Sequence, residues 1–120
     1  MGDMTKNFSR SEFACNCGCG YESIQPKLVE KLQIARDYLD FGMKINSGCR
    51  CVSWNKHEGG KRNSAHRTGW AADINVTSSA KRHALRMALI KAGFNRFGTG
   101  KGFLHVDCDE SKPSKVEWVY

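Results

Sequence analysis

Residues 64–73 read SAHRTGWAAD and contain an imidazole at His66 and a carboxylate at Asp73, separated by six residues. Histidine nitrogens and carboxylate oxygens are both common ligands of zinc. This separation differs from the i, i+4 spacing that places two ligands on one face of a helix. If His66 lies in a loop and Asp73 on the strand that follows it, the chain can fold back and bring both side chains to one point. A third ligand must then come from elsewhere in the sequence.

His105, in the segment FLHVDC at 103–108, is the candidate third ligand. Successive side chains of a strand point to opposite faces, so His105 and Asp107 are expected on the same face. Leu104 and Val106 would take the other face, where they suit a hydrophobic core. Two histidines and one carboxylate, with a fourth position open for water, match the ligand count of a catalytic zinc site.

The helices and strands that must position these residues can also be predicted. Ser9 and Glu12 fit a capping box, which predicts a short N-terminal helix flanked by Phe8 and Phe13. Apolar residues at near-helical spacing predict two longer helices, and short apolar or alternating segments predict strands. The predicted helices are 26–40 and 78 or 79 to 92, the predicted strands are 43–46, 70–76, 103–108 and 116–120, and 53–63 is predicted to be a loop.

The order of these elements favours an α+β fold, because helices and strands mix without a β-α-β rhythm. The chain has 120 residues, of which 40% are apolar, and it shows no internal repeat or linker. A chain of this length and composition is expected to form one domain with one modest core. We therefore expect a single domain over residues 1–120, with an N-terminal helix and a cysteine-rich loop, at about 8–20, docked on it.

Three sequence elements together resemble a known family. The segment 64–73 with its later His105 is similar to the zinc signature S-x-H-x-x-G-x-A-x-D…H of the M15-type peptidases. This group contains D-alanyl-D-alanine carboxypeptidases and L-alanyl-D-glutamate endopeptidases, and the Hedgehog signalling domain is structurally related to it. The segment SGCR at 47–50 resembles the family's S-G-Y-R element, and Asn55 with the following Gly59-Gly60 resembles its N-x-x-x-G-G segment. The resemblance runs from about residue 8 to residue 107.

The resemblance implies a fold, a cofactor and an activity. The implied fold is a small antiparallel sheet flanked by helices, with a metal on the exposed face of the sheet. The implied cofactor is one catalytic Zn²⁺ held by His66, Asp73 and His105. The implied activity is hydrolysis of peptide bonds in the stem peptide of bacterial peptidoglycan, in a phage-type endolysin or a cell-wall remodelling enzyme. Zinc would polarise the scissile carbonyl and lower the pKa of its bound water from about 15.7 towards 7.

The general base is where the sequence departs from part of the family. Many members place an acidic residue a few positions before the last histidine, whereas 97–104 reads FGTGKGFL and contains no acid. The local carboxylate is Asp107, two residues beyond His105 and about 6.6 Å further along the same strand face. We predict that Asp107 is the general base. A role in orienting a metal ligand and a merely structural role both stay open.

Other residues of the signature have expected roles. The resemblance implies that Arg50 faces the substrate, because a guanidinium can pair with a peptide carboxylate or a developing oxyanion; the alternative is a structural salt bridge. Ser64 is expected either to hydrogen-bond substrate or to hold its loop. Gly69 is expected to adopt a backbone conformation that a side chain would forbid. His57 and His83 are predicted to lie outside the metal site.

The six cysteines raise a separate question. They occur as Cys15-x-Cys17-x-Cys19, Cys49-x-Cys51 and Cys108. The C-x-C spacing is tighter than the C-x2-C spacing of zinc ribbons. A second, structural metal bound by thiolates of the N-terminal loop and Cys51 is one hypothesis. Reduced thiols that pack in the core and disulfides formed after release are the alternatives.

Charge and the absence of targeting signals limit the partners and the location. The formal net charge is +7, which favours polyanionic surroundings such as nucleic acid, phospholipid headgroups or a bacterial cell wall. The basic residues are scattered and form no stripe, so nucleic-acid binding is disfavoured. We find no signal peptide and no apolar run of the ~18 residues that a membrane span requires. We expect a monomer that is cytoplasmic in the producing cell and acts on the cell wall after release.

Two further functions compete with a peptidase. A non-catalytic zinc-binding module of the Hedgehog type would use the same three ligands for structure or partner recognition, and the missing acid before His105 favours it. Nucleic-acid binding rests on charge alone. The choice between carboxypeptidase and endopeptidase stays open, because it depends on the shape of loops.

Overall fold

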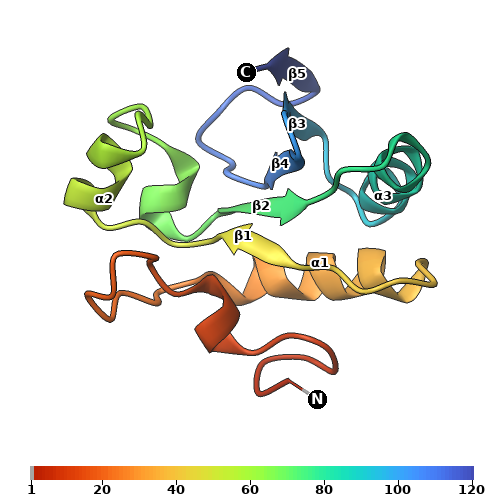
Figure 1. Ribbon diagram of the computed structural model, residues 1–120, viewed down its shortest axis with the longest axis horizontal. Helices are drawn as coiled ribbons and strands as arrows, with labels where there is room; N and C mark the ends of the chain where they lie inside the picture. The colour runs from red at the N-terminus through yellow and green to blue at the C-terminus, as the bar shows by residue number, and fades with distance from the viewer. Residues whose placement is uncertain (1) are drawn as a thin grey trace.

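The computed structural model describes residues 2–120 (Figure 1). Three α-helices, two short 3₁₀ helices (η) and five strands follow one another along the chain. They are η1 (Arg10–Phe13), α1 (Pro26–Asp37), β1 (Ile45–Ser47), α2 (Val52–His57), η2 (Ala65–Thr68), β2 (Ala71–Asn75), α3 (Ser79–Lys91), β3 (Arg96–Gly100), β4 (Phe103–Asp107) and β5 (Val116–Val119).

The five strands form one sheet in the order β1-β2-β4-β3-β5. All neighbouring pairs are antiparallel except β3 and β5, which are parallel. A tight turn joins β3 to β4, and a longer connection after β4 returns the chain to the far side of β3. The predicted α+β fold is confirmed, and the sheet differs from an all-antiparallel one only at the β5 edge.

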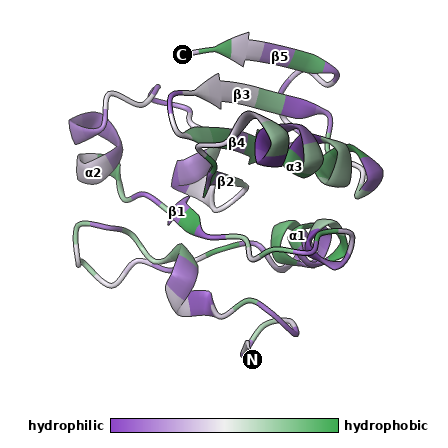
Figure 2. Ribbon diagram, turned by 45° about the vertical axis from the view of Figure 1, so that its right-hand side comes forward, coloured by the Kyte–Doolittle hydropathy of each residue, from purple (hydrophilic) through white to green (hydrophobic). Residues whose placement is uncertain are grey.

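One face of the sheet packs against α1 and α3 and forms the hydrophobic core. Along β2 and β4, every second side chain points towards these helices, as the pleat of a strand requires. Figure 2 shows that both helices carry hydrophobic and hydrophilic residues, as expected of helices with one buried face. The largest buried side chains of this core are Leu28, Leu32, Ile74, Leu85, Leu89, Leu104 and Val106. The other face of the sheet is therefore free to carry polar residues.

The N-terminal segment docks on the rest of the molecule through two phenylalanines. Phe8 and Phe13 are fully buried, with ring centroids 5.9 Å apart. The Glu12 carboxylate accepts a hydrogen bond from the backbone N–H of Ser9 at 2.7 Å, as predicted for the capping box. The Cα radius of gyration of 13.2 Å is close to the roughly 13.6 Å expected for one compact domain of this length.

The structure corrects three sequence-based assignments. The segment 53–63, predicted to be a loop, contains most of α2, because the Cys51 sulfur accepts a hydrogen bond from the Trp54 N–H and begins the helix. The strand at 96–100 is absent from the prediction, since the two glycines of RFGTG weaken the strand pattern. The first long helix ends at Asp37 and does not extend to 40.

Within residues 2–120, none of the helices combines the length and the apolar character needed to cross a bilayer.

Candidate metal centre

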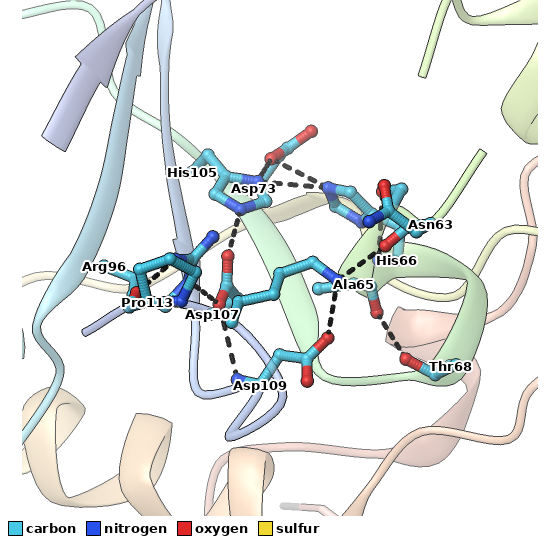
Figure 3. Close-up of polar contacts among 12 residues, drawn as sticks. Asn63, Ala65, His66, Thr68, Asp73, Arg96, His105, Asp107, Asp109 and Pro113 are labelled. Atoms are coloured by element: carbon cyan, nitrogen blue, oxygen red, sulfur yellow. Dashed lines mark hydrogen bonds and ion pairs between the residues drawn. The ribbon is translucent and has the colours of Figure 1, made fainter. Parts of the chain in front are cut away.

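His66, Asp73 and His105 meet on the face of the sheet that is opposite the helices (Figure 3). Asp73 on β2 and His105 on β4 are direct cross-strand partners. His66 reaches them from η2, which immediately precedes β2. The Nε2 atom of His66 lies 3.2 Å from Asp73 Oδ1 and 3.2 Å from His105 Nδ1, and His105 Nδ1 lies 2.9 Å from Asp73 Oδ1. The structure thus brings together the three residues predicted as metal ligands.

The outer nitrogen of His66 is held by the backbone. His66 Nδ1 lies 2.7 Å from the carbonyl oxygen of Gly48, which can only accept a hydrogen bond. The ring therefore carries its proton on Nδ1, and the lone pair of Nε2 points towards Asp73 and His105. This is the tautomer that a metal ligand requires.

His105 is oriented in the same way by a carboxylate. Its Nε2 atom lies 2.8 Å from Asp107 Oδ2, so Nε2 donates, and in the neutral ring the lone pair of Nδ1 points to the centre. Asp107 is itself fixed, because its Oδ1 atom accepts hydrogen bonds from Arg96 Nε at 2.6 Å and from the backbone N–H of Asp109 at 3.3 Å. Both oxygens of Asp107 are thus engaged, and the side chain is 2% exposed.

The three inward-facing atoms fit a zinc ion. Two imidazole lone pairs and one carboxylate oxygen are all acceptors, and no donor among residues 2–120 is placed between them. Ligands at about 2.0–2.2 Å from a tetrahedral zinc lie roughly 3.3–3.5 Å from one another. The observed separations of 2.9–3.2 Å need only a small expansion. A cation at this point would remove the repulsion between the acceptors.

Electrostatics in the centre favour a cation as well. Burial alone would raise the pKa of Asp73, but the close contacts with the imidazoles of His105 and His66 outweigh burial and hold it well below its usual range. Burial would also raise the pKa of Asp107, and its contacts with His105 and Arg96 outweigh this effect and lower it. For His105, burial would lower the pKa, but the two carboxylates outweigh it and raise the pKa above 6.5. Both carboxylates are therefore charged at neutral pH.

Arg50 lies behind Asp73 and does not stand free in solvent. Its guanidinium donates to Asp73 Oδ2 at 3.2 Å, to Ser47 Oγ at 3.2 Å and to Asn55 Oδ1 at 3.4 Å. Asn55 is buried and donates in turn to the carbonyl of Lys61 at 2.8 Å. Since Oδ1 of Asp73 faces the histidines and Oδ2 faces Arg50, this arginine fixes the orientation of the carboxylate.

A comparison with known families matches a model described as Peptidase M15 to residues 6–109, which is most of the chain. The chain belongs to the M15 peptidase family. Membership implies a metallopeptidase, and the zinc dependence of the family agrees with the donor set described above. A search of curated proteins finds no match to the chain.

Two further signature residues of this M15 peptidase shape the loop that carries His66. The hydroxyl of Ser64 accepts a hydrogen bond from the backbone N–H of His66 at 3.2 Å and so begins η2. Gly69 ends η2 with φ of +79°, and a Cβ atom there would collide with the carbonyl oxygen of Ser23. Glycine is therefore needed for both its backbone conformation and its close approach to the neighbouring chain.

Sequence analysis missed the aromatic residues beside the centre of this M15 peptidase. Gly98 on β3 pairs with His105 on one side and with Trp118 on the other. Because Gly98 has no side chain, the rings of His105 and Trp118 meet above it, with centroids 5.3 Å apart. Tyr120 adds a second ring, 6.3 Å from His105. The sequence WVY signals only a strand, because its partner strand β3 is not recognisable from its own residues.

Two surface cavities flank the centre of the M15 peptidase. One, of about 360 Å³, is lined by Tyr21, Arg50, Cys51, Val52 and Arg67. The other, of about 350 Å³, reaches Asp107 from the side of Arg96 and Lys112. His57 and His83 are exposed and belong to neither cavity. Each cavity thus borders one residue that contacts a candidate ligand, Arg50 in the first and Asp107 in the second.

Proposed function

We propose that this M15 peptidase is a zinc-dependent enzyme that hydrolyses peptide bonds of the peptidoglycan stem peptide. One observation carries the proposal: three acceptor atoms converge within 3.2 Å, and the outer nitrogen of each histidine is already held by a fixed acceptor. Such preorganisation is typical of a metal site. A solvated cluster of polar residues would not need it.

The residues around this centre have distinct proposed roles. His66, Asp73 and His105 would hold the ion. When bound, zinc acts as a Lewis acid that polarises the scissile carbonyl and acidifies a water molecule. Arg50 holds the Asp73 carboxylate through Oδ2, and Ser64 holds the loop of His66 through its hydroxyl.

Asp107 is assigned as a positioning residue in this proposal. Its Oδ2 atom accepts from His105 Nε2, its Oδ1 atom accepts from Arg96 and from the Asp109 N–H, and the side chain is 2% exposed, so both oxygens are already engaged in fixed contacts. This assignment favours the orienting role over the general base that the sequence suggested. The hydrogen bond to Asp107 keeps Nδ1 of His105 unprotonated and pointing inwards.

The cavity beside Arg50 suits an acidic peptide. Besides Arg50, whose guanidinium is held by Asp73, Ser47 and Asn55, this cavity is lined by a second arginine, Arg67. Stem peptides carry free carboxylates, and a guanidinium can bind a carboxylate through two parallel hydrogen bonds. The formal net charge of +7 supports attraction to an anionic cell wall. We propose a monomer that reaches the wall after release from the cytoplasm of the producing cell, as a phage-type endolysin or a remodelling enzyme.

The test is digestion of purified peptidoglycan by the full-length protein. The proposal predicts new free amino groups, their loss after treatment with a chelator, and their return when zinc is added back. Mass spectrometry of the soluble products identifies the bond, since a carboxypeptidase releases single D-alanine and an endopeptidase releases larger fragments. Intact walls from several peptidoglycan types, with zinc bound, would exclude catalysis.

A non-catalytic zinc-binding module of the Hedgehog type is the second candidate. It is favoured by the burial of all three candidate ligands, none of which is more than 7% exposed, and by the position of Trp118 next to His105. This function predicts stoichiometric zinc without hydrolysis of any peptidoglycan. The same digestion experiment, combined with zinc analysis of the same sample, distinguishes the two candidates.

A further inference from the structure

Four cysteines come together at a second place in the molecule, where the N-terminal loop meets the start of α2. Cys15, Cys17 and Cys19 lie on the loop after η1, and Cys51 caps the N-terminus of α2. The sulfur of Cys15 lies 3.4 Å from that of Cys17 and 3.8 Å from that of Cys51, and Cys17 and Cys51 are 3.7 Å apart. All four sulfurs lie within 4.8 Å of one another. We name these four residues the thiol cluster.

The distances among the sulfurs of Cys15, Cys17 and Cys51 are close to those of a tetrahedral zinc–thiolate site. Four sulfurs at about 2.3 Å from one zinc ion lie about 3.8 Å from one another. A disulfide would instead hold two sulfurs at about 2.05 Å, and all six cysteines are free. A cluster of several irons needs bridging sulfides between the cysteine ligands, and sulfurs this close together leave room for a single ion.

The loop is folded so that its three cysteines, which occupy every second position, face one point. The Cys15 N–H donates to the carbonyl of Tyr21 at 2.8 Å, and the Gly18 N–H donates to the carbonyl of Cys15 at 3.2 Å. Gly18 and Gly20 both have positive φ, 81° and 87°, which lets the chain turn twice within a few residues. The glycines of the segment CNCGCG therefore serve the convergence of its three thiols.

Backbone donors are already aimed at two of the sulfurs. The Cys51 N–H lies 3.4 Å from Cys15 Sγ, and the Trp54 N–H lies 3.4 Å from Cys51 Sγ. Backbone N–H groups that point at a sulfur stabilise a thiolate, which is the form that binds a metal. Each of these two sulfurs therefore already has a backbone donor directed at it.

Core packing does not account for the thiol cluster. Cysteines that serve only as small hydrophobic residues are among the most buried residues of a protein. Cys49 is 1% exposed and fits that description, whereas Cys17 and Cys19 are exposed. Two exposed thiols placed beside a buried one need another explanation, and soft thiolate ligands select zinc among the common divalent ions.

We propose that Cys15, Cys17, Cys19 and Cys51 bind one structural Zn²⁺ ion, separate from the ion at His66, Asp73 and His105. The four protein ligands close the coordination sphere and leave no position for substrate, as in other structural zinc sites. The ion links the N-terminal loop to the segment that carries Arg50. The Cys49 N–H donates to the carbonyl of Phe13 at 2.8 Å, so this segment already touches η1 next to the loop.

The test uses the full-length His66→Ala variant, in which the proposed catalytic site is damaged. Metal analysis is expected to find one remaining zinc per chain, and X-ray absorption is expected to show four sulfur neighbours at about 2.3 Å. Adding Cys17→Ser and Cys19→Ser to this variant removes two exposed ligands with little effect on the core, and it is expected to abolish zinc binding. Adding Cys108→Ser instead is the matched control, because Cys108 lies outside the cluster, and the zinc is expected to stay.

Several results would overturn the proposal. His66→Ala protein without zinc, a zinc spectrum with nitrogen or oxygen neighbours in place of sulfur, or iron in place of zinc would each contradict it. Equal loss of zinc in the Cys108→Ser control would also contradict it. Cobalt substitution gives an independent readout, because thiolate ligands to cobalt absorb intensely in the near ultraviolet. This absorption must be lost when Cys17→Ser and Cys19→Ser are added and must persist when Cys108→Ser is added instead. These readouts do not depend on peptidase activity, so the proposal can fail or stand independently of the proposed function.

Discussion

Asp73 and His105 are cross-strand partners on β2 and β4, and Asp73 Oδ1 lies 2.9 Å from His105 Nδ1. The pairing places a carboxylate and an imidazole side by side on the rigid part of the sheet. His66 is brought to them by η2, whose last turn ends at a glycine and leads directly into β2. The centre is thus built on hydrogen-bonded backbone, which holds ligands more accurately than a loop does.

Substitution of Asp107 separates a positioning role from a base role. Asp107→Ala leaves Nε2 of His105 without an acceptor. The ring can then adopt the other tautomer, in which Nδ1 is protonated and has no lone pair for a metal. We expect zinc affinity at this centre to fall about 10–100-fold, and less in Asp107→Asn, whose amide oxygen can still accept. Chelator competition measures the affinity, with the exposed Glu110→Gln as control. Unchanged zinc affinity together with lost cleavage would instead indicate the general base.

Position 50 is expected to require the planar guanidinium group of arginine. A lysine keeps the charge but cannot reach Asp73, Ser47 and Asn55 together. Because Arg50 orients a candidate metal ligand, we expect Arg50→Lys to lower kcat/KM on peptidoglycan fragments by roughly 10-fold. The exposed Arg62→Lys is the matched control and should behave like the wild type. Full activity of Arg50→Lys would show that only the charge at this position matters.

Two glycines with similar backbone conformations give a matched test of stability. Gly59 has φ of +74° and open space around its Cα, whereas Gly69 has φ of +79° and faces the Ser23 carbonyl. Gly59→Ala is expected to cost about 1 kcal/mol from backbone strain alone. Gly69→Ala should cost clearly more, because the neighbouring backbone must move as well. Denaturant unfolding measures both, and equal costs would contradict the close packing of η2 against the chain at Ser23.

The zinc-free protein should show an unusual dependence of stability on pH. The pKa of His105 is raised above 6.5 in the folded state, so its stabilisation is complete below about pH 6.5 and is lost as the pH rises through the raised value. The pKa values of Asp73 and Asp107 are lowered, so their stabilisation is present above about pH 3.8 and is lost as the pH falls towards the lowered values. Chelated protein should therefore unfold at a higher temperature near pH 5.5 than near pH 8, by roughly a few degrees.

The control for this pH dependence is the Asp107→Asn variant. It removes one of the two carboxylates that raise the pKa of His105, so the difference in unfolding temperature should shrink. With zinc present the trend should reverse, because zinc binding requires neutral histidine and grows stronger as the pH rises. A zinc-free protein that is more stable near pH 8 than near pH 5.5 would contradict the contact network around His105.

Each candidate ligand could be proposed from sequence because its own local pattern is informative, whereas their meeting depends on the pairing of β2 with β4. The alternation of residues 103–107 places His105 and Asp107 on one face, and the glycine and serine of 64–73 favour a loop before a strand. The contacts of Arg50 could not be predicted in the same way. Asp73 and Asn55 are its partners only once β1, β2 and α2 are assembled, and neither distance is encoded in the segment SGCR.

The part of the fold missed by sequence analysis is also the part that depends on distant partners. RFGTG forms β3 because β4 and β5 hydrogen-bond to its two edges, which outweighs the weak strand propensity of its glycines. Position 98 requires glycine because a Cβ atom there would collide with the rings of Trp118 and Tyr120, which follow it by about twenty positions in the chain. The thiol cluster is one of several alternatives that the sequence leaves open, because Cys51 joins the N-terminal loop only through tertiary structure.

The most direct test of the account is zinc-dependent release of amino groups from purified peptidoglycan by the Asp73→Ala and His83→Ala variants. Asp73 is a candidate ligand, whereas His83 is an exposed residue on α3 and serves as the control. The account predicts that wild type and His83→Ala release amino groups only when zinc is present, and that Asp73→Ala releases none while remaining folded. Undiminished, chelator-resistant cleavage by Asp73→Ala would contradict it.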